Sequence, residues 1–232
     1  MHARIVFAVL ALGLCASHGT AASEWSGYAV ATSDYVFRGV TQSDGHAALQ
    51  LGIDAAFDSG AFLGAWASTV DIPGPDDVQR SAEARIYAGY GFDINERLRA
   101  TLAVVAYRYP DSDGPVDYEN QEALLSLGID DTYWFEYAYS PDLYEFGWDT
   151  HNIDLFAEWP LGASWSASIG VGYQRLDAQT RHDSFYSQLG LTRTFSQFAV
   201  DARLHNAVEA MPFIGGEDRV GTRASISLRW DF

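Results

Sequence analysis

The stretch RHDS holds the two residue types that a hydrolase would use, with His182 and Ser184 two positions apart on one predicted strand face. A histidine base and a serine nucleophile at that spacing can share a hydrogen bond. The strand register predicted for this segment turns both side chains toward a loop or the inside of the fold. A solvated loop is therefore the favoured interpretation, and the sequence assigns no catalytic residue.

The other histidines give no metal site. His46 and His151 fall in or near predicted loops, and His205 falls on an inward strand face. No two histidines have the spacing of zinc ligands. The segment DSDGPVD lacks the full spacing and the terminal Glu of a calcium loop. The sequence therefore predicts no metal and no cofactor.

The composition limits the partners. The chain has 232 residues, 48% of them hydrophobic, which is enough for one domain. Its formal net charge is −17, and all 14 basic residues are arginine. A nucleic-acid partner requires a basic patch against the phosphates, so this acidic chain excludes nucleic acid.

Residues 1–22 are interpreted as a cleaved signal peptide. His2 and Arg4 precede the apolar run IVFAVLALGL, as in the basic start of a signal peptide. The small residues of GTAAS place the cleavage after Ala22. Cleavage removes Cys15 and leaves residues 23–232 without a cysteine for a disulfide. No later run of 18 apolar residues predicts a transmembrane helix.

Hydrophobicity after residue 24 repeats with a period of two, which is the strand period. In AALQLGIDAAFD, Leu49, Leu51 and Ile53 share one face, whereas Gln50 and Asp54 lie on the other. Such segments exceed most globular strands and match tilted membrane strands of roughly 9–11 residues with extensions. Twelve segments are predicted, at about 25–38, 47–58, 61–71, 80–92, 97–109, 119–130, 132–140, 148–159, 163–176, 183–195, 197–206 and 219–232.

Connections between these segments alternate strictly in length. Short turns such as DSG, DINE and PLGA alternate with longer polar loops such as GVTQSDGH, IPGPDDVQ and NAVEAMPFIGGED. The alternation predicts an all-β fold over residues 23–232, an up-and-down antiparallel transmembrane β-barrel of 12 strands with short periplasmic turns. The even strand count places both chain ends in the periplasm and pairs the first strand with the last.

In such a barrel the apolar face points into lipid and the polar face lines the lumen. The first strand is expected to run outward as far as Arg38, so that Tyr35 and Phe37 face lipid while Asp34 and Arg38 face the lumen. The residues expected to face lipid include Leu51, Ile53, Ala84, Ile86, Ile169, Ile226 and Leu228.

Aromatic residues gather near both ends of the predicted strands, as in the two aromatic girdles of membrane barrels. The group near the long loops is Tyr35, Phe37, Tyr107, Tyr139, Trp148, Tyr173 and Phe185. The group next to the tight turns is Trp25, Phe57, Phe62, Phe92, Tyr133, Trp159, Trp165, Phe195, Phe198 and Trp230.

A family resemblance rests on the stretch SDYVFRGVTQ, on ALQLG at 48–52 and on the hairpin GAFLGAWASTVD. These motifs, with EARIYAGY and the pairs Tyr109–Pro110 and Tyr118–Glu119, resemble the Gcw_chp family of bacterial outer-membrane proteins, also grouped as TorF-type porins. The likeness is strong over residues 25–120 and generic beyond them. It implies an outer-membrane barrel with a porin label and transfers no catalytic residue or substrate.

The last strand indicates the expected partners. It ends on Phe232, with Trp230, Leu228 and Ile226 at alternate positions, and this pattern resembles the assembly signal of outer-membrane barrels. The barrel-assembly machinery is therefore expected to bind the C-terminal strand. Outer-membrane lipid and lipopolysaccharide are the other expected partners, the localisation is the bacterial outer membrane, and a monomer is favoured.

Mixed charges occupy the predicted lumenal face. They can line a pore, or pair across strands and plug it, and a narrow, partly obstructed channel is favoured. An Asp34–Arg223 ion pair is predicted where the first and last strands meet, with separate solvation of the two charges as the alternative. The predicted pore-lining residues are Asp34, Arg38, Asp54, Glu83, Arg85, Arg99, Glu122, Glu136, Asp154, Glu158, Arg203, Arg223 and Arg229.

Acidic side chains crowd the long loops. Solvation alone explains such clusters, and the alternative is a mouth that concentrates cations or binds divalent ions shared with lipopolysaccharide. Both interpretations stay open for Asp71, Asp76, Asp77, Asp111, Asp113, Asp117, Asp142, Glu145, Asp149, Glu209, Glu217 and Asp218.

Three functions fit this description. A passive channel for small polar solutes is favoured, and on that interpretation the chain is not an enzyme. The alternatives are a structural or adhesive barrel with a blocked lumen and acidic loops, and a barrel hydrolase that modifies lipids through Ser184.

Overall fold

The computed structural model describes residues 24–73, 79–110, 119–176, 182–209 and 217–232, so the predicted signal peptide lies outside the described residues. All twelve predicted strands are present. Their bounds are β1 (Glu24–Thr32), β4 (Ala48–Ala56), β5 (Ala61–Pro73), β6 (Gln79–Asp93), β7 (Leu98–Arg108), β8 (Asn120–Ile129), β9 (Tyr133–Ser140), β10 (Thr150–Pro160), β11 (Trp165–Leu176), β12 (His182–Thr194), β13 (Phe198–Val208) and β14 (Gly221–Asp231).

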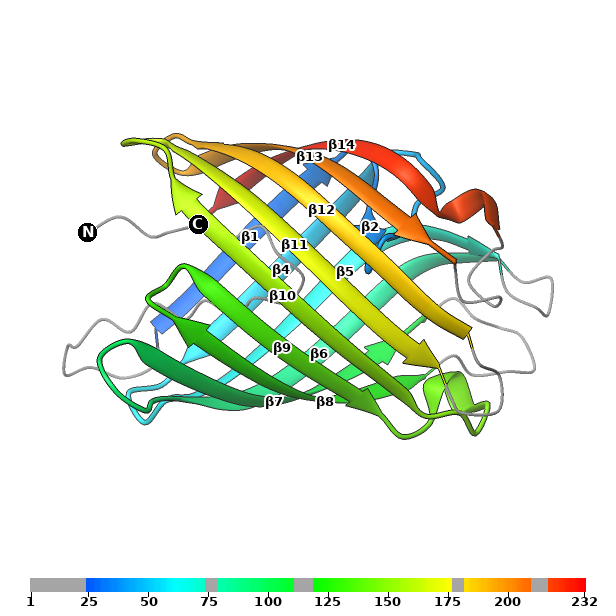
Figure 1. The fold of residues 1–232 in the computed structure, drawn as a ribbon, viewed down its shortest axis with the longest axis horizontal. Coiled ribbons are helices and arrows are strands. Elements are labelled where there is room, and N and C mark those ends of the chain that lie inside the picture. Colours follow the sequence, from blue (N-terminus) through cyan, green and yellow to red (C-terminus); the bar gives the residue numbers. More distant parts are fainter. Residues whose placement is uncertain (1–23, 74–78, 111–118, 177–181, 210–216) are drawn as a thin grey trace.

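These strands close into one antiparallel barrel in which each strand pairs with its neighbours along the chain (Figure 1). The seam joins β1 to β14, with Tyr28 opposite Asp231 and Thr32 opposite Ser227. Phe232 extends the seam, because its backbone exchanges two 2.9 Å hydrogen bonds with Gly27. Closure removes the free sheet edges, and the predicted up-and-down topology is confirmed. No helix among the described residues is long and apolar enough to cross a membrane.

The two ends of the barrel differ, as the alternation of connections predicts. Tight turns join β4 to β5, β6 to β7, β8 to β9, β10 to β11 and β12 to β13, and the seam strands begin and finish at this turn end. The longer connections lie at the opposite, loop end. They carry the 3₁₀ turns η1 (Leu143–Glu145) and η2 (Glu217–Arg219).

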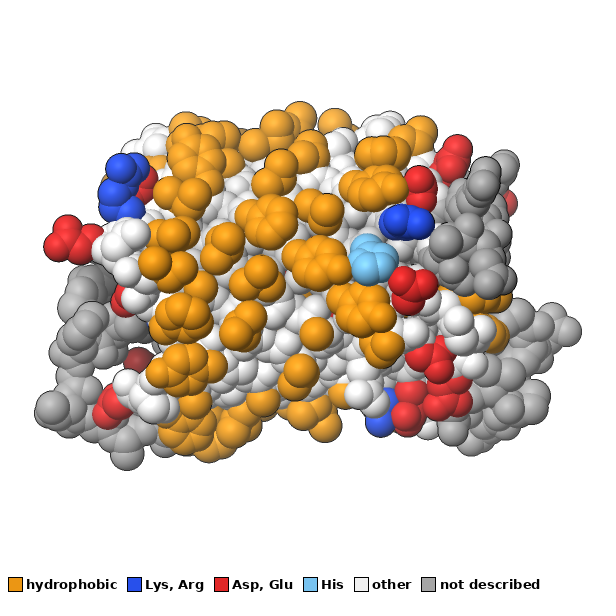
Figure 2. Space-filling view, turned by 60° about the horizontal axis from the view of Figure 1, so that its bottom comes forward, with side chains coloured by type: hydrophobic (Ala, Val, Ile, Leu, Met, Phe, Trp, Pro, Cys, Tyr) orange, Lys and Arg blue, Asp and Glu red, His pale blue; other side chains and the backbone are white. Residues whose placement is uncertain are grey.

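The outer surface carries a broad apolar band between two polar ends, as Figure 2 shows for one side of the barrel. Leu51 and Ile86 are 61% and 66% exposed on this band. The same outward position holds for Ile53, Ile169, Ile226 and Leu228, so the predicted outward face is confirmed for these residues. Ala84 lies two positions before Ile86 on β6 and is half-buried.

The aromatic ring at the turn end is also present, with one exception. Phe62 was expected to face outward but is 4% exposed on the inner face of β5, where it packs beside Tyr87. The prediction is wrong there because Phe62 shares the face of Gly64 and Trp66. The exposed members of the ring are Trp25, Phe57, Phe92, Tyr133, Trp159, Trp165, Phe195, Phe198 and Trp230.

At the loop end, the predicted course of the first strand and of its aromatic residues is wrong. Strand β1 ends at Thr32, and the next residues leave the barrel wall and form a hairpin of β2 (Val36–Phe37) and β3 (Val40–Thr41) inside the ring of strands (Figure 1). Tyr35 and Phe37 therefore lie in the interior, not in a lipid-facing girdle. Of the remaining residues expected in that girdle, Tyr107 is buried on the inner face of β7 and Trp148 packs against a cluster at the loop end.

Replacement of an outward residue by arginine tests the apolar band. Ile53→Arg should cost roughly 2–4 kcal/mol of unfolding free energy, because it puts a charge on the lipid face near mid-strand. Gln50→Arg on the inner face of the same strand β4 is the matched control and should cost far less. Urea unfolding of the protein in liposomes measures both, and equal losses would contradict the assignment of the two faces.

Candidate functional site

The inward hairpin turns at Arg38 and Gly39, whose φ angles are 48° and 78°. Two successive positive φ values suit a two-residue hairpin turn, and glycine at the second position lowers the steric cost. A Cβ atom on Gly39 would lie 2.6 Å from the Cβ atoms of both Tyr186 and Ala207, on β12 and β13. The tip therefore lies inside the lumen against β12 and β13, with no room for a larger residue.

An ion pair holds the tip against β8. The Arg38 guanidinium donates two hydrogen bonds to the Glu122 carboxylate, at 2.6 and 3.0 Å, and the Tyr107 hydroxyl donates a third at 2.8 Å. Arg38 and Glu122 are 6% and 3% exposed. A bidentate guanidinium–carboxylate contact fixes both distance and orientation, so Arg38 sets where the hairpin sits in the lumen.

A second arginine is enclosed by aromatic rings from the hairpin and the wall. The Arg85 guanidinium carbon lies 4.5 Å from the ring centre of Phe37, 4.4 Å from that of Trp66 and 4.7 Å from that of Tyr107. Arg85 also donates to Glu83 at 2.6 Å and to the Tyr35 hydroxyl at 2.5 Å. Cation–π contacts of this kind contribute about 0.5–2 kcal/mol each. Tyr35 and Phe37 thus face Arg85, which explains why this aromatic pair leaves the lipid face.

The base of the hairpin is fixed at the seam through Asp34. This carboxylate accepts hydrogen bonds from the hydroxyls of Thr41 at 2.5 Å and Ser43 at 3.1 Å. Its other oxygen lies 3.6 Å from the Arg223 guanidinium on β14. The predicted Asp34–Arg223 pair is therefore confirmed, although Asp34 stands in the connection after β1 and not on the strand itself.

Apolar side chains cover the hairpin at the loop end. Leu143 of η1 is 3% exposed and belongs to one buried cluster with Tyr35 and Val40. The Tyr144 ring lies 6.1 Å from that of Tyr109 in an edge contact. Burial raises the pKa of Tyr35 and raises the pKa of Tyr144 to about 12, so both hydroxyls stay protonated at neutral pH. Buried apolar and aromatic side chains therefore pack around the described part of the hairpin at the loop end.

Toward the turn end the interior is wetter. The Arg229 guanidinium lies 3.8 Å from the Tyr28 ring centre and donates to Asp231 at 2.7 Å. Arg99 lies 3.8 Å from Asp93, and these two side chains are 30% and 58% exposed. Solvent therefore reaches the inner charged groups from the turn end.

All thirteen predicted pore-lining residues lie on the inner side of the barrel or in the hairpin segment. Eleven are on inner strand faces, and Asp34 and Arg38 belong to the segment between β1 and β4. The structure joins Arg38 to Glu122, Arg85 to Glu83 and Arg223 to Asp34. Arg203 pairs instead with Asp201, which the sequence prediction left out.

The favoured interpretation of His182 and Ser184 as part of a solvated loop is wrong, because both residues belong to strand β12 and Ser184 is buried. Ser184 is 5% exposed and shares the inner face of β12 with Tyr186, as the predicted register required. The side chain of His182 lies outside the described residues. His205 is lumenal as predicted, with Nε2 lying 3.1 Å from the Ser225 hydroxyl.

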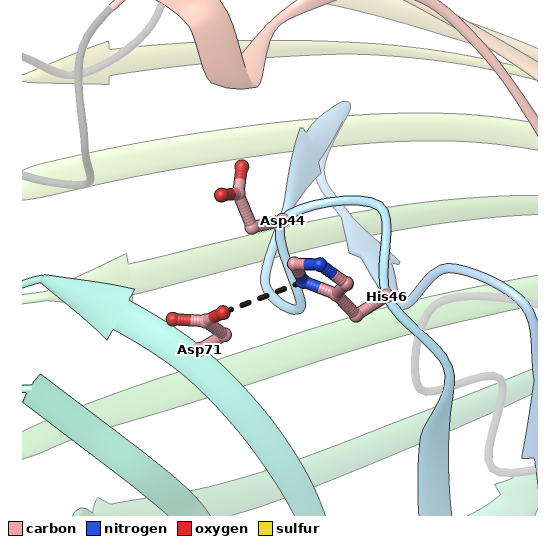
Figure 3. Close-up of side chains that lie close together, drawn as sticks. All are labelled: Asp44, His46 and Asp71. Atoms are coloured by element: carbon pink, nitrogen blue, oxygen red, sulfur yellow. Dashed lines mark ion pairs between the residues drawn. The ribbon is translucent and has the colours of Figure 1, made fainter.

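One cluster at the loop end escaped the sequence analysis. Asp44 and His46 follow the hairpin, Asp71 lies on β5, and the ligand atoms of these three side chains are within 4.8 Å of one another (Figure 3). Residues so far apart in the chain show no ligand spacing in sequence. Asp44 lies 3.8 Å from Arg219, and Asp71 accepts a hydrogen bond from Gln79, so both carboxylates already have partners.

Residues 16–210 match the family model described as "Bacterial protein of unknown function (Gcw_chp)". The chain belongs to the Gcw_chp family. A comparison with curated proteins finds no sequence match.

Solved structures support the barrel. The chain is similar to the KdgM porin, with 10% identity, a TM-score of 0.55 and coverage of 89% of this chain and 99% of that one. Similarity to the NanC porin is comparable, at 9% identity, a TM-score of 0.57 and coverage of 90% and 98%. The CymD monoaromatic hydrocarbon channel gives 12% identity, a TM-score of 0.51 and coverage of 91% and 88%. At these identities the likeness establishes the fold.

Removal of the Arg38 guanidinium tests the ion pair that holds the hairpin against Glu122. Arg38→Ala should lower the unfolding free energy by about 3–5 kcal/mol, because it leaves the Glu122 carboxylate buried without its cation. The double variant Arg38→Ala with Glu122→Gln removes both charges and should recover most of that loss. Thermal unfolding in detergent micelles measures the series, and a single variant as stable as the wild type would contradict a buried pair.

Proposed function

We propose that this chain is a narrow passive channel of the bacterial outer membrane for small polar solutes. The observation that carries the proposal is the closed barrel whose charged interior contains the hairpin Val36–Thr41, clamped by Arg38 on Glu122. Charged side chains such as Arg99 and Asp93 stay open to solvent inside the barrel, as a route for polar solutes requires. The similar structures described as porins support the same assignment.

The position of the hairpin explains why the proposed channel would admit only small solutes. The hairpin lies inside the lumen near the loop end, and the apolar cluster around Leu143 covers it there. Charged groups open to solvent, such as Arg99 and Asp93, lie on the turn-end side. A solute that passes must move beside the hairpin, between its polar backbone and the charged wall, which favours small hydrophilic molecules over large or apolar ones.

The proposed location follows from the outer surface. An apolar band with an aromatic ring at one end fits the hydrocarbon layer and its interface. The tight turns would face the periplasm, and the acidic loops would face outward, where lipopolysaccharide and its divalent ions are the expected neighbours. The barrel-assembly machinery is proposed to bind β14 and Phe232 during insertion.

Gly39→Ala tests the role of the hairpin in conduction. The added methyl group collides with the wall at Ala207, so the tip must move and the channel should widen. Gly147→Ala is the matched control, because Gly147 also has a positive φ, of 74°, but has no atom within 4 Å of its would-be Cβ. Planar-bilayer recording should give a small conductance for the wild type and the control and a larger one for Gly39→Ala.

Other outcomes decide against the proposal. No conductance in the wild type or in Gly39→Ala, with both proteins folded, would indicate a blocked barrel that acts through its loops. Release of fatty acid from purified lipopolysaccharide that is lost in Ser184→Ala would indicate an enzyme instead.

A further inference from the structure

Two carboxylates face each other across neighbouring strands inside the barrel. Glu136 on β9 and Asp154 on β10 are directly opposite partners, and both point inward. Directly opposite residues have Cβ atoms roughly 4.5–5.5 Å apart, and like charges there repel each other. Such a pair inside a barrel requires something that neutralises it.

The described contacts give Asp154 hydrogen bonds from neutral groups and give neither carboxylate a cation. Asp154 accepts from the Tyr186 hydroxyl at 2.6 Å and from the Asn152 amide. Glu136 is 7% exposed, and its Oε1 atom is buried without any hydrogen-bond partner. Within the described part of the chain neither carboxylate has an ion pair.

The nearby guanidinium groups of Arg38 and Arg203 already bind other carboxylates. Arg38 and Glu122 are the charged groups that act electrostatically on both Glu136 and Asp154, and Arg38 is bound bidentately by Glu122. Arg203, which bonds Gln188 at 3.1 Å, also gives two hydrogen bonds to Asp201. Because Glu122 already neutralises Arg38, the ionised forms of Glu136 and Asp154 would add two negative charges that no described ion pair compensates.

A small cavity lies beside the pair. Its volume is about 30 Å³, and its lining includes Glu136, Asp154, Ser126, Gln188 and the rings of Trp134 and Phe156. This space holds one particle about the size of a water molecule. The unpartnered Glu136 carboxylate lines the cavity, so the site combines an excess of two charges with room for one small ion.

We propose that Glu136 and Asp154 bind one divalent cation of the Ca²⁺ or Mg²⁺ type in the barrel lumen. Carboxylate oxygens are the ligands that these hard cations prefer, and the charge of the ion matches the excess. Ser126 and Gln188 line the same cavity, and the Gln188 side-chain oxygen already accepts a hydrogen bond from Arg203. The site is a property of the barrel wall, so its existence does not depend on whether the barrel conducts.

Calorimetric titration of the metal-stripped, folded protein with CaCl₂ and with MgCl₂ tests the proposal. The wild type should show a site whose affinity falls at least about tenfold in Glu136→Gln and in Asp154→Asn. Asp71→Asn, at the exposed cluster of the loop end, is the control and should keep that site. Each isosteric variant removes a repelling charge and retains hydrogen-bonding atoms, so both should fold.

A second readout is the melting temperature. Ca²⁺ should raise it in the wild type and in Asp71→Asn but much less in Glu136→Gln, because only a ligand that binds the folded state stabilises it. The proposal is overturned if the wild type has no such site, if Glu136→Gln binds like the wild type, or if only Asp71→Asn loses binding. It is also overturned if infrared spectra at saturating Ca²⁺ keep a protonated carboxyl band that Glu136→Gln removes, since a proton would then neutralise the pair.

Discussion

The ion pair between Arg38 and Glu122 is the contact on which the interior of this barrel depends. A guanidinium at the tip of a six-residue hairpin cannot stay inside a barrel unless a carboxylate on the opposite wall receives it, because an unpaired buried charge is strongly unfavourable. Glu122 is that carboxylate. Phe37 and Tyr107 pack around this contact, and Gly39 follows Arg38 in the turn and lies against Ala207 and Tyr186.

The closed sheet makes the contact possible. Closure satisfies the backbone hydrogen bonds of every barrel strand and leaves the inner faces free to carry charge. Arg85 is stabilised differently from Arg38. Three aromatic rings surround its guanidinium, and Glu83 on the same strand neutralises its charge. The Asp34–Arg223 contact then ties the hairpin to the seam, so the segment that obstructs the lumen is attached where the two chain ends meet.

The sequence predicted the barrel well, because a period of two and the alternation of turn lengths are local properties of the chain. It also placed Asp34 near Arg223, since strand order alone brings them together. The prediction that the first strand continues past Thr32 was wrong. The alternating pattern of SDYVFRG is the same for a lipid-facing strand and for a hairpin buried among aromatic rings. The signal that distinguishes them is the pair Arg38–Gly39, which suits a two-residue turn with positive φ values. The Asp44, His46 and Asp71 cluster and the Glu136–Asp154 pair were beyond reach, because both depend on strand register across the barrel.

The most direct test of this account is a nuclear Overhauser measurement on the unmodified protein in detergent micelles. Gly39 and Ala207 are far apart in the sequence, and a Cβ on Gly39 would lie 2.6 Å from that of Ala207 only because the hairpin folds into the lumen. A strong cross-peak between the Gly39 α-protons and the Ala207 methyl group is the result this account predicts. Its absence, with Gly39 cross-peaks only to water or detergent, would place the hairpin outside the lumen and contradict the account.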